Sequence, residues 1–297
     1  MIPDFALVRV RSTGWRRKVY GTLSFGWRGT TKQWNRLEMA MQIMAIAILP
    51  VAVSVHSIVS FDFSMANVPM WHSTIFGPYF VAGAIFSGIA ALIIAMAVLR
   101  KTLRLEKYLL PMHFDNLGKL LLLMCILWAY FVFAERLTVW YGNEPHEMAV
   151  FMAVQQGEFA PFYWTMVTCN FVIAFIILAN YKTRTMAGCV VASLGVLIGM
   201  WLERFLIIVP TLMHKQLPYS WGTYAARPVE LMIMAAAFAA MVLLYALFSK
   251  FVPIISIWEL KAGLSSRLDS ATMTEASLMS TRLSGVDLPP EVKGERA

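Results

Sequence analysis

Ionisable side chains inside long apolar stretches are the residues of this sequence with the clearest chemical potential. Two Glu–Arg dipeptides, Glu135–Arg136 and Glu203–Arg204, and one imidazole, His56, lie in such stretches. A charge in hydrocarbon is costly, so these groups are expected to turn inward, pair, or mark a path for protons or substrate. Adjacent residues on a helix point about 100° apart. We therefore predict pairs between helices, Glu135 with Arg204 or Arg136 with Glu203.

Two interpretations of these groups are open from the sequence. In one, the Glu–Arg pairs hold a helix bundle together as buried polar contacts. In the other, they belong to a proton path or a quinone site, because a quinol that is oxidised releases protons to a base and to carboxylates. His56 fits the second role and equally a structural histidine bonded to a nearby carbonyl. The candidates for quinone or proton handling are His56, Tyr130, Glu135, Arg136, Glu203 and Arg204.

The composition indicates an integral membrane protein. Hydrophobic residues make up 59% of the chain and charged residues 14%, whereas soluble domains are roughly half apolar and about a quarter charged. Six apolar stretches approach the ~20 residues that a spanning helix needs, and none alternates as a strand would. We predict an all-α membrane fold with a four-helix-bundle-type core. The predicted spans are 39–61, 75–99, 117–141, 162–181, 187–212 and 229–252.

Lys and Arg are concentrated in alternate connections. They are frequent in 1–37, in 100–119 and after Lys250, and they are absent from 62–74 and 142–161. By the positive-inside rule both termini are expected to be cytoplasmic. The candidate groups then lie in the outer half of the membrane. Three further candidates are expected at the outer mouth: Asp62, His72 and Glu230.

The segments outside the spans differ from them in composition. Residues 1–37 are basic and rich in aromatic side chains, and are expected to lie along lipid headgroups. Nucleic-acid binding is the rival explanation of the net charge of +8, and the membrane context makes nucleic acid an unexpected partner. We predict a six-helix transmembrane domain over 38–258. Residues 259–297 are polar, rich in Ser and Thr, and predicted to be a disordered cytoplasmic tail.

No sequence motif indicates a cofactor or metal held by this chain. Cys125, Cys169 and Cys189 lie in apolar stretches without a CxxC pair, so a metal cluster is not expected. Paired intramembrane histidines that could ligate a haem are also missing. We assign no catalytic residue. Gly195 and Gly199 form a GxxxG pattern, which predicts a close helix–helix contact.

Four stretches carry a resemblance to a known family. They are VSVHSIVSFDF (53–63), PMWHSTIFGPYFVAGAIFSG (69–88), LERFLIIVP (202–210) and WGTY (221–224). Together they make the chain resemble the polysulfide-reductase NrfD-type membrane subunit family over about residues 3–260. Within that family the sequence is similar to the ActC-type subunit of alternative complex III, a quinol-oxidising complex.

The resemblance implies an all-helical subunit of the bacterial inner (cytoplasmic) membrane. It implies quinone or quinol as substrate, no cofactor in this chain, and iron–sulfur clusters in a partner subunit on the outer face. Multihaem cytochrome subunits, with their haems, and a second NrfD-type subunit are the other partners it implies. The chain is then a multi-pass subunit of a quinol-oxidising electron-transfer complex, non-catalytic alone.

The resemblance also implies a division of the family's membrane helices into two halves. Full-length members carry about four more helices ahead of the segment that begins here as IPDFA. Those helices hold Gly-His-Ala-Gly and Trp-Asp motifs associated with quinone, and neither motif occurs in this sequence. We expect this chain to correspond to the second half, with Glu135, Arg136, Glu203 and Arg204 as candidate proton-path residues.

Overall fold

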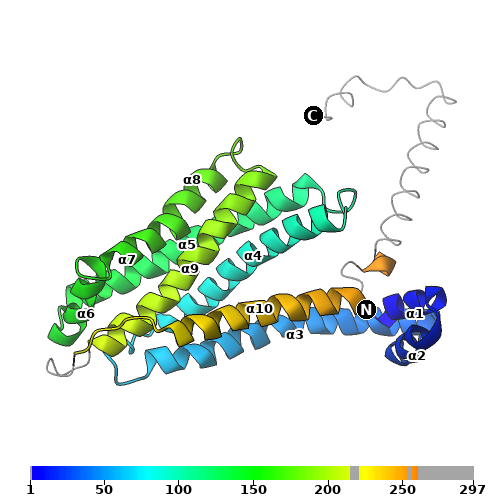
Figure 1. The fold of residues 1–297 in the computed structure, drawn as a ribbon, viewed down its shortest axis with the longest axis horizontal. Coiled ribbons are helices and arrows are strands. Elements are labelled where there is room, and N and C mark those ends of the chain that lie inside the picture. The colour runs from blue at the N-terminus through cyan, green and yellow to red at the C-terminus, as the bar shows by residue number, and fades with distance from the viewer. Residues whose placement is uncertain (1, 215–220, 253–255, 260–297) are drawn as a thin grey trace, which may run out of the picture. The chain divides into compact units, whose positions relative to one another are not determined.

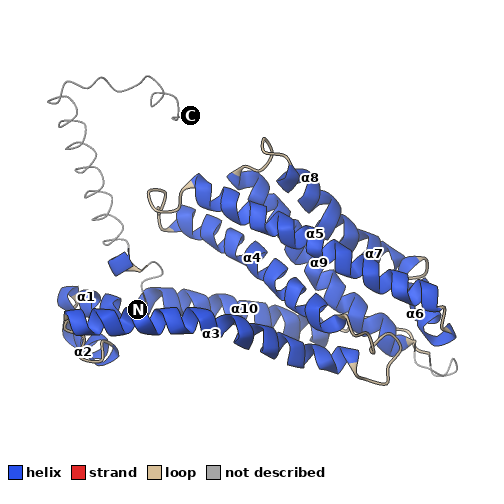
Figure 2. Cartoon of the chain, turned by 180° about the vertical axis from the view of Figure 1, so that it is seen from behind, coloured by secondary structure: helices blue, strands red, loops and turns tan. Residues whose placement is uncertain are grey.

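The computed structural model describes residues 2–214, 221–252 and 256–259. Over these ranges the chain is helical and contains no strand (Figures 1 and 2). Six helices in the described part of the chain are long and apolar enough to cross a membrane, which confirms the predicted all-α membrane fold. They are α3 (Thr31–Ser64), α4 (Phe76–Thr102), α5 (Pro111–Gly142), the segmented helix Ala160–Ala179, α9 (Met186–Met213) and α10 (Pro228–Phe251).

Most of the helices extend beyond the predicted spans. The first helix is the clearest case: it begins at Thr31 and has 34 residues, although ~20 suffice to cross the hydrocarbon. Hydropathy detects only the apolar part of such a helix, whereas the backbone hydrogen bonds continue through the polar residues before it. The predicted tail, 259–297, lies outside the described residues except for Glu259.

The chain divides into two compact units. One comprises Met1–Ile43 and Ala226–Ala297, and the other comprises Met44–Ala225, so the boundary falls within α3. The predicted domain limits at 37 and 258 stay a prediction.

The larger unit contains a four-helix bundle. Its members are α4, α5, α9 and the segmented helix, which consists of α7 (Ala160–Val167), η1 (Thr168–Ile173) and α8 (Ala174–Ala179). Each member packs on two or more of the others, and the short helix α6 (Pro145–Gln155) packs on α5, α7 and α9. Phe86, Trp128, Leu178 and Val196 are fully buried between the helices. The predicted four-helix-bundle-type core is therefore confirmed.

A close helix contact in this bundle lies where the segmented helix takes a π-helical turn, η1. A Cβ on Gly199 would collide with the side chain of Asn170 and would lie 3.2 Å from its backbone nitrogen. A Cβ on Gly195 would lie 3.4 Å from the carbonyl oxygen of Cys169. The contact predicted from the GxxxG pattern is thus confirmed, and its partner is η1. Small residues let two backbones approach closely where no side chain could be accommodated.

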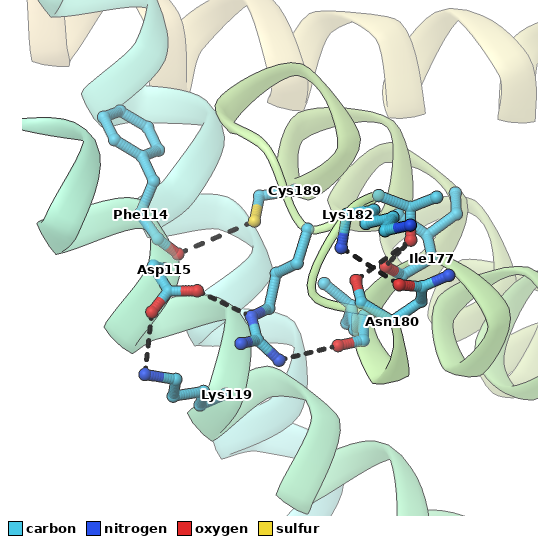
Figure 3. Close-up of polar contacts among 10 residues, drawn as sticks. Phe114, Asp115, Lys119, Ile177, Asn180, Lys182 and Cys189 are labelled. Atoms are coloured by element: carbon cyan, nitrogen blue, oxygen red, sulfur yellow. Dashed lines mark hydrogen bonds and ion pairs between the residues drawn. The ribbon is translucent and has the colours of Figure 1, made fainter. Parts of the chain in front are cut away.

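A polar cluster joins α5 to the turn between α8 and α9 (Figure 3). The carboxylate of Asp115 accepts a hydrogen bond from Arg184 Nε at 2.7 Å and pairs with Lys119 Nζ at 2.7 Å. Arg184 Nη1 also donates to the carbonyl of Leu178 at 3.0 Å. Nearby, the Cys189 thiol donates to the carbonyl of Phe114 at 3.6 Å. Because Arg184 contacts a carboxylate on α5 and a carbonyl at the end of α8, it fixes the register of the two elements.

The smaller unit contains two helices within the segment 1–37. These are α1 (Ile2–Arg11) and α2 (Gly14–Leu23), which pack on each other. The Tyr20 hydroxyl donates to the carbonyl of Phe251 at 2.9 Å, and the Phe5 and Tyr20 rings stack with their centroids 6.1 Å apart. The segment is therefore attached to the end of α10. Composition alone did not predict these helices.

We predict that Gly199→Ala lowers the free energy of unfolding by about 1–3 kcal/mol, the usual cost of overpacking a tight contact. The added methyl group would meet Asn170. The matched control is Gly88→Ala in α4, where an added Cβ has nothing within 4 Å and where alanine favours the helix by roughly 1 kcal/mol. Thermal unfolding of both variants in one detergent makes the comparison. Equal unfolding temperatures for the two variants would contradict the contact.

Candidate functional site

The candidate site is centred on Glu203, a carboxylate on α9 that is only 2% exposed. One of its oxygens, Oε1, accepts a hydrogen bond from Trp128 Nε1 at 2.5 Å. The same oxygen accepts a short hydrogen bond from the hydroxyl of Tyr79. Tyr79 lies on α4 and Trp128 lies on α5, so one carboxylate oxygen connects three helices of the bundle.

The other oxygen of Glu203 has a different environment. No hydrogen bond reaches Oε2 from the described residues. The nearest cation is Arg204 on the same helix, whose Nη2 lies 3.9 Å away. The Arg204 guanidinium lies over the Phe80 ring, with Cζ 3.9 Å from the centroid, an arrangement that stabilises a cation by the ring quadrupole. Glu203 thus has one hydrogen-bonded oxygen and one oxygen free to accept a proton or a water.

A small cavity lies beside this carboxylate. Its volume is about 30 Å³, room for one or two water molecules at roughly 10–15 Å³ each. The polar part of its lining consists of six side chains: Tyr79, Glu135, Arg136, Glu203, Thr211 and the indole of Trp71. Buried polar atoms without protein partners around a space of this size favour bound water. The cavity therefore suits water and is too small for a quinone ring.

Glu135 and Arg136 reach this cavity from α5. Glu135 is 9% exposed. The Arg136 guanidinium lies over the Tyr163 ring with Cζ 5.3 Å from its centroid, and its Nε and Nη1 have no hydrogen-bond partner within the described part of the chain. The structure therefore brings Glu135, Arg136 and Glu203 to one cavity. Arg204 does not line this cavity, but its Nη2 lies 3.9 Å from Oε2 of Glu203.

A larger cavity begins on the other side of Arg136. Its volume is about 470 Å³, within the ~300–1,000 Å³ typical of small-molecule sites. Val132 and Arg136 line both cavities. Most of the lining is aromatic or aliphatic, with Trp128, Phe133, Trp140, Tyr163 and Phe171 supplying rings. An aromatic ring could thus be accommodated here but not in the smaller cavity.

The predicted cross-helix ion pairs are wrong. Over the described ranges, neither Glu135 with Arg204 nor Arg136 with Glu203 forms an ion pair, and Glu203 has its own neighbour Arg204 as its nearest cation instead. The reason is that neutral groups replace the expected charges. Tyr79 and Trp128 donate to the carboxylate. Phe80 and Tyr163 hold the two guanidinium groups.

Tyr79 and Trp128 were not among the sequence candidates. Trp128 lies well inside its apolar stretch, where Trp is less common than at the membrane interface, whereas Tyr79 lies near the start of the predicted span 75–99. A buried Tyr hydroxyl or Trp N–H usually finds a hydrogen-bond partner. The depth of Trp128 was therefore a usable signal, although it does not say which acceptor the indole finds. The position of Tyr79 gave no such signal.

Three predicted residues do not join the cluster. His56 Nδ1 bonds to the carbonyl oxygen of Ala52 at 2.7 Å, which favours the structural interpretation of this histidine. Tyr130 is 60% exposed and contacts the neighbouring Phe131 ring. Asp62 is exposed near the end of α3. None of the three lines the small cavity.

The remaining two candidates for the mouth have local partners. His72, in the loop after α3, has its Nε2 in close contact with the carboxylate of Glu147 on α6. Glu230 lies in the other unit, where its Oε2 accepts a hydrogen bond from the backbone nitrogen of Arg227 at 3.2 Å and so caps α10. Within the described ranges, no group of three or more His, Cys, Asp or Glu side chains converges to hold a metal.

Together the bundle and its buried carboxylates define a multi-pass helical membrane protein with ionisable groups gathered around small cavities. The family model for polysulphide reductase, NrfD, matches residues 17–216, which is more than half of the chain and includes every residue of the small cavity. The chain therefore belongs to the NrfD family, whose members are membrane subunits of quinone-linked oxidoreductases. A comparison with curated proteins found no match.

We predict that Tyr79→Phe lowers the free energy of unfolding by about 1–3 kcal/mol, because a buried acceptor loses a donor. Tyr130→Phe is the matched control: it removes the same hydroxyl from the same residue type at an exposed position. It should leave stability within about 0.5 kcal/mol of the parent. Thermal unfolding in detergent distinguishes them. If both variants unfold with the parent, the hydroxyl of Tyr79 contributes nothing to the carboxylate site.

Proposed function

We propose that this chain is an ActC-type subunit of alternative complex III that handles protons during quinol oxidation. The ActC assignment rests on the sequence resemblance, and one structural observation carries the proton-handling role. Glu203 is buried, hydrogen-bonded through a single oxygen, and borders a water-sized cavity together with Glu135. A carboxylate inside a membrane protein with one oxygen available is a common element of a proton relay.

The two cavities support a division of roles. The larger one admits an aromatic ring, so a quinol would lie there with its hydroxyl groups toward Arg136. Arg136 also lines the smaller cavity, where one or two water molecules would connect to the carboxylates. A quinol that gives up two electrons also releases two protons. These would pass through the water to Glu135 and Glu203, while the electrons leave for a partner subunit.

The expected partners follow from the family and from the charge pattern. Basic connections alternate with connections that are poorer in Lys and Arg, which supports cytoplasmic termini: 62–74 and 142–161 have none, and 213–228 has two. The small cavity then lies toward the outer side of a bacterial inner membrane. An iron–sulfur subunit docked on that face would accept the electrons and pass them to the haems of multihaem cytochrome subunits, with a second NrfD-type subunit in the same complex. This chain itself would bind no metal.

A purely structural anchor is the second candidate function. The same carboxylate supports it, because Glu203 accepts hydrogen bonds from α4 and α5 and thereby connects them to α9. Under this alternative the Glu203 site keeps the bundle assembled and the chain docks its partners without taking part in proton transfer.

The two functions predict different effects of Glu203→Gln and Glu135→Gln. Glutamine keeps the shape and an acceptor oxygen for Trp128, but it cannot take up a proton. In the assembled complex we expect the rate of quinol oxidation per complex to fall by at least ~10-fold. A direct acid–base catalyst contributes ~10²–10⁴-fold, and a relay residue that acts through water is expected to contribute less. The control is Glu158→Gln, which changes an exposed glutamate between α6 and α7.

The measurements are the quinol oxidation rate, proton release and abundance of the complex in membranes. Slower turnover with normal abundance supports proton handling. Lower abundance with unchanged turnover per complex supports the structural anchor. Unchanged values for both quantities would refute both roles for these carboxylates.

A further inference from the structure

The smaller unit holds a basic cavity that has no part in the proposed function. It lies among α1, α2, the first turn of α3 and residues 256–259, and its volume is about 550 Å³. Three arginines, Arg9, Arg17 and Arg28, contribute the charge of its lining. Three indole rings and several small or apolar residues form the rest: Trp27, Trp34, Trp258, Pro3, Ala6, Leu7, Val10 and Gly29.

The indole wall of this cavity is held in place by a buried carboxylate. Asp4 on α1 is 1% exposed, and its Oδ1 accepts hydrogen bonds from the backbone nitrogens of Ile257 at 2.8 Å and Trp258 at 3.1 Å. The Trp258 ring then packs on Trp34 with centroids 5.1 Å apart, and Trp34 packs on Trp27 at 5.0 Å. The three rings form a continuous row, so this wall is organised by contacts inside the protein.

The loop that carries Arg28 is also fixed. The side chain of Gln33 accepts a hydrogen bond from the backbone nitrogen of Arg28 at 2.9 Å and donates to the carbonyl of Gly26 at 3.4 Å. Gln33 lies in the first turn of α3, so the loop is tied to that helix. Arg28 therefore enters the cavity from a defined backbone position.

The arginines of the cavity form no ion pair within the described ranges. None of the ion pairs there involves Arg9, Arg17 or Arg28, and no carboxylate lines the cavity. A second cavity of about 480 Å³ adjoins it and is lined by Arg9, Arg17 and Lys18. Arg9 and Arg17 line both cavities. Arg9 packs over Gly21, where an added Cβ would lie 3.4 Å from its Nε.

We infer that this arginine–tryptophan cavity binds the phosphodiester headgroup of an anionic phospholipid. A guanidinium group offers two parallel N–H donors that match two phosphate oxygens. Tryptophan side chains favour the headgroup level of a bilayer, and the apolar wall would contact the start of the acyl chains. Basic segments beside a membrane helix attract anionic lipids in general. Here the organised ring wall and the unpaired arginines make a defined site.

The test uses the full chain, purified in detergent and titrated with phosphatidylglycerol or phosphatidylcholine under native mass spectrometry. The parent protein is expected to bind phosphatidylglycerol and to bind phosphatidylcholine at least ~10-fold more weakly, because the arginines repel the choline cation that phosphatidylcholine carries beside the same phosphodiester. The site variant is the triple change Arg9→Gln, Arg17→Gln and Arg28→Gln. We expect it to lose phosphatidylglycerol affinity by at least ~10-fold.

The matched control removes three arginines of the same segment that line neither cavity: Arg11→Gln, Arg16→Gln and Arg36→Gln. Both triple variants have the same net charge. The control should keep most of the lipid affinity. An equal loss in the two variants would mean that the whole basic segment attracts lipid, and equal binding of both lipids would mean that charge plays no part. Either result would overturn the site.

Two further arms keep the inference testable if the triple variant folds poorly. Arg17→Lys alone keeps the charge but removes the planar fork, so a measurable loss of affinity supports the site and an unchanged affinity overturns it.

In the second experiment, inorganic phosphate is added to the parent protein with bound phosphatidylglycerol. Retention of the lipid at millimolar phosphate supports a lipid headgroup. Complete displacement would assign the cavity to free phosphate instead and overturn the lipid assignment.

Discussion

The burial of one carboxylate, Glu203, is the constraint on which the arrangement of the bundle depends. A carboxylate removed from water is stable only where donors or cations replace its hydration. Here Tyr79 and Trp128 provide those donors from α4 and α5. Because both must reach the same oxygen, the rotation of α4 and α5 relative to α9 is fixed at this level. The smaller cavity lies beside that fixed point and is lined from α4, α5, α6, α7 and α9, and the larger one is lined from α5, α6, α7 and η1.

Polar and small residues set the helix positions at two other levels along α9. In the turn just before α9, Arg184 contacts Asp115 on α5 at 2.7 Å. Further along, Gly199 lets Asn170 of η1 approach so closely that no Cβ would fit. In a membrane, lipid tails are as apolar as leucine, so apolar burial alone provides little preference for one helix arrangement over another. These three contacts are specific because each needs a particular partner at a particular level.

Features that depend on the residues of a single helix could be predicted from the sequence. The spans were found because ~20 apolar residues cross hydrocarbon, and the contact at Gly199 because small residues mark close approach. The pairing of Glu203 was missed, because it depends on how helices are rotated and which ones are neighbours. Hydropathy contains neither fact. The rings that hold Arg136 and Arg204 were missed for the same reason, and so was the π-helical turn at 168–173.

The sizes of the two cavities limit how a proton path and a quinol could coexist in this bundle. A space of about 30 Å³ beside Glu203 takes water and excludes a ring, whereas the neighbouring space of about 470 Å³ takes a ring. Arg136 lines both, so it is the ionisable residue that the two cavities share. A bound ring would therefore meet a hydrogen-bond donor first and the carboxylates only through water. This separation would keep the carboxylates out of direct contact with a quinol in the larger cavity. A proton relay through water can work in that arrangement, whereas a direct catalytic base must reach the substrate itself.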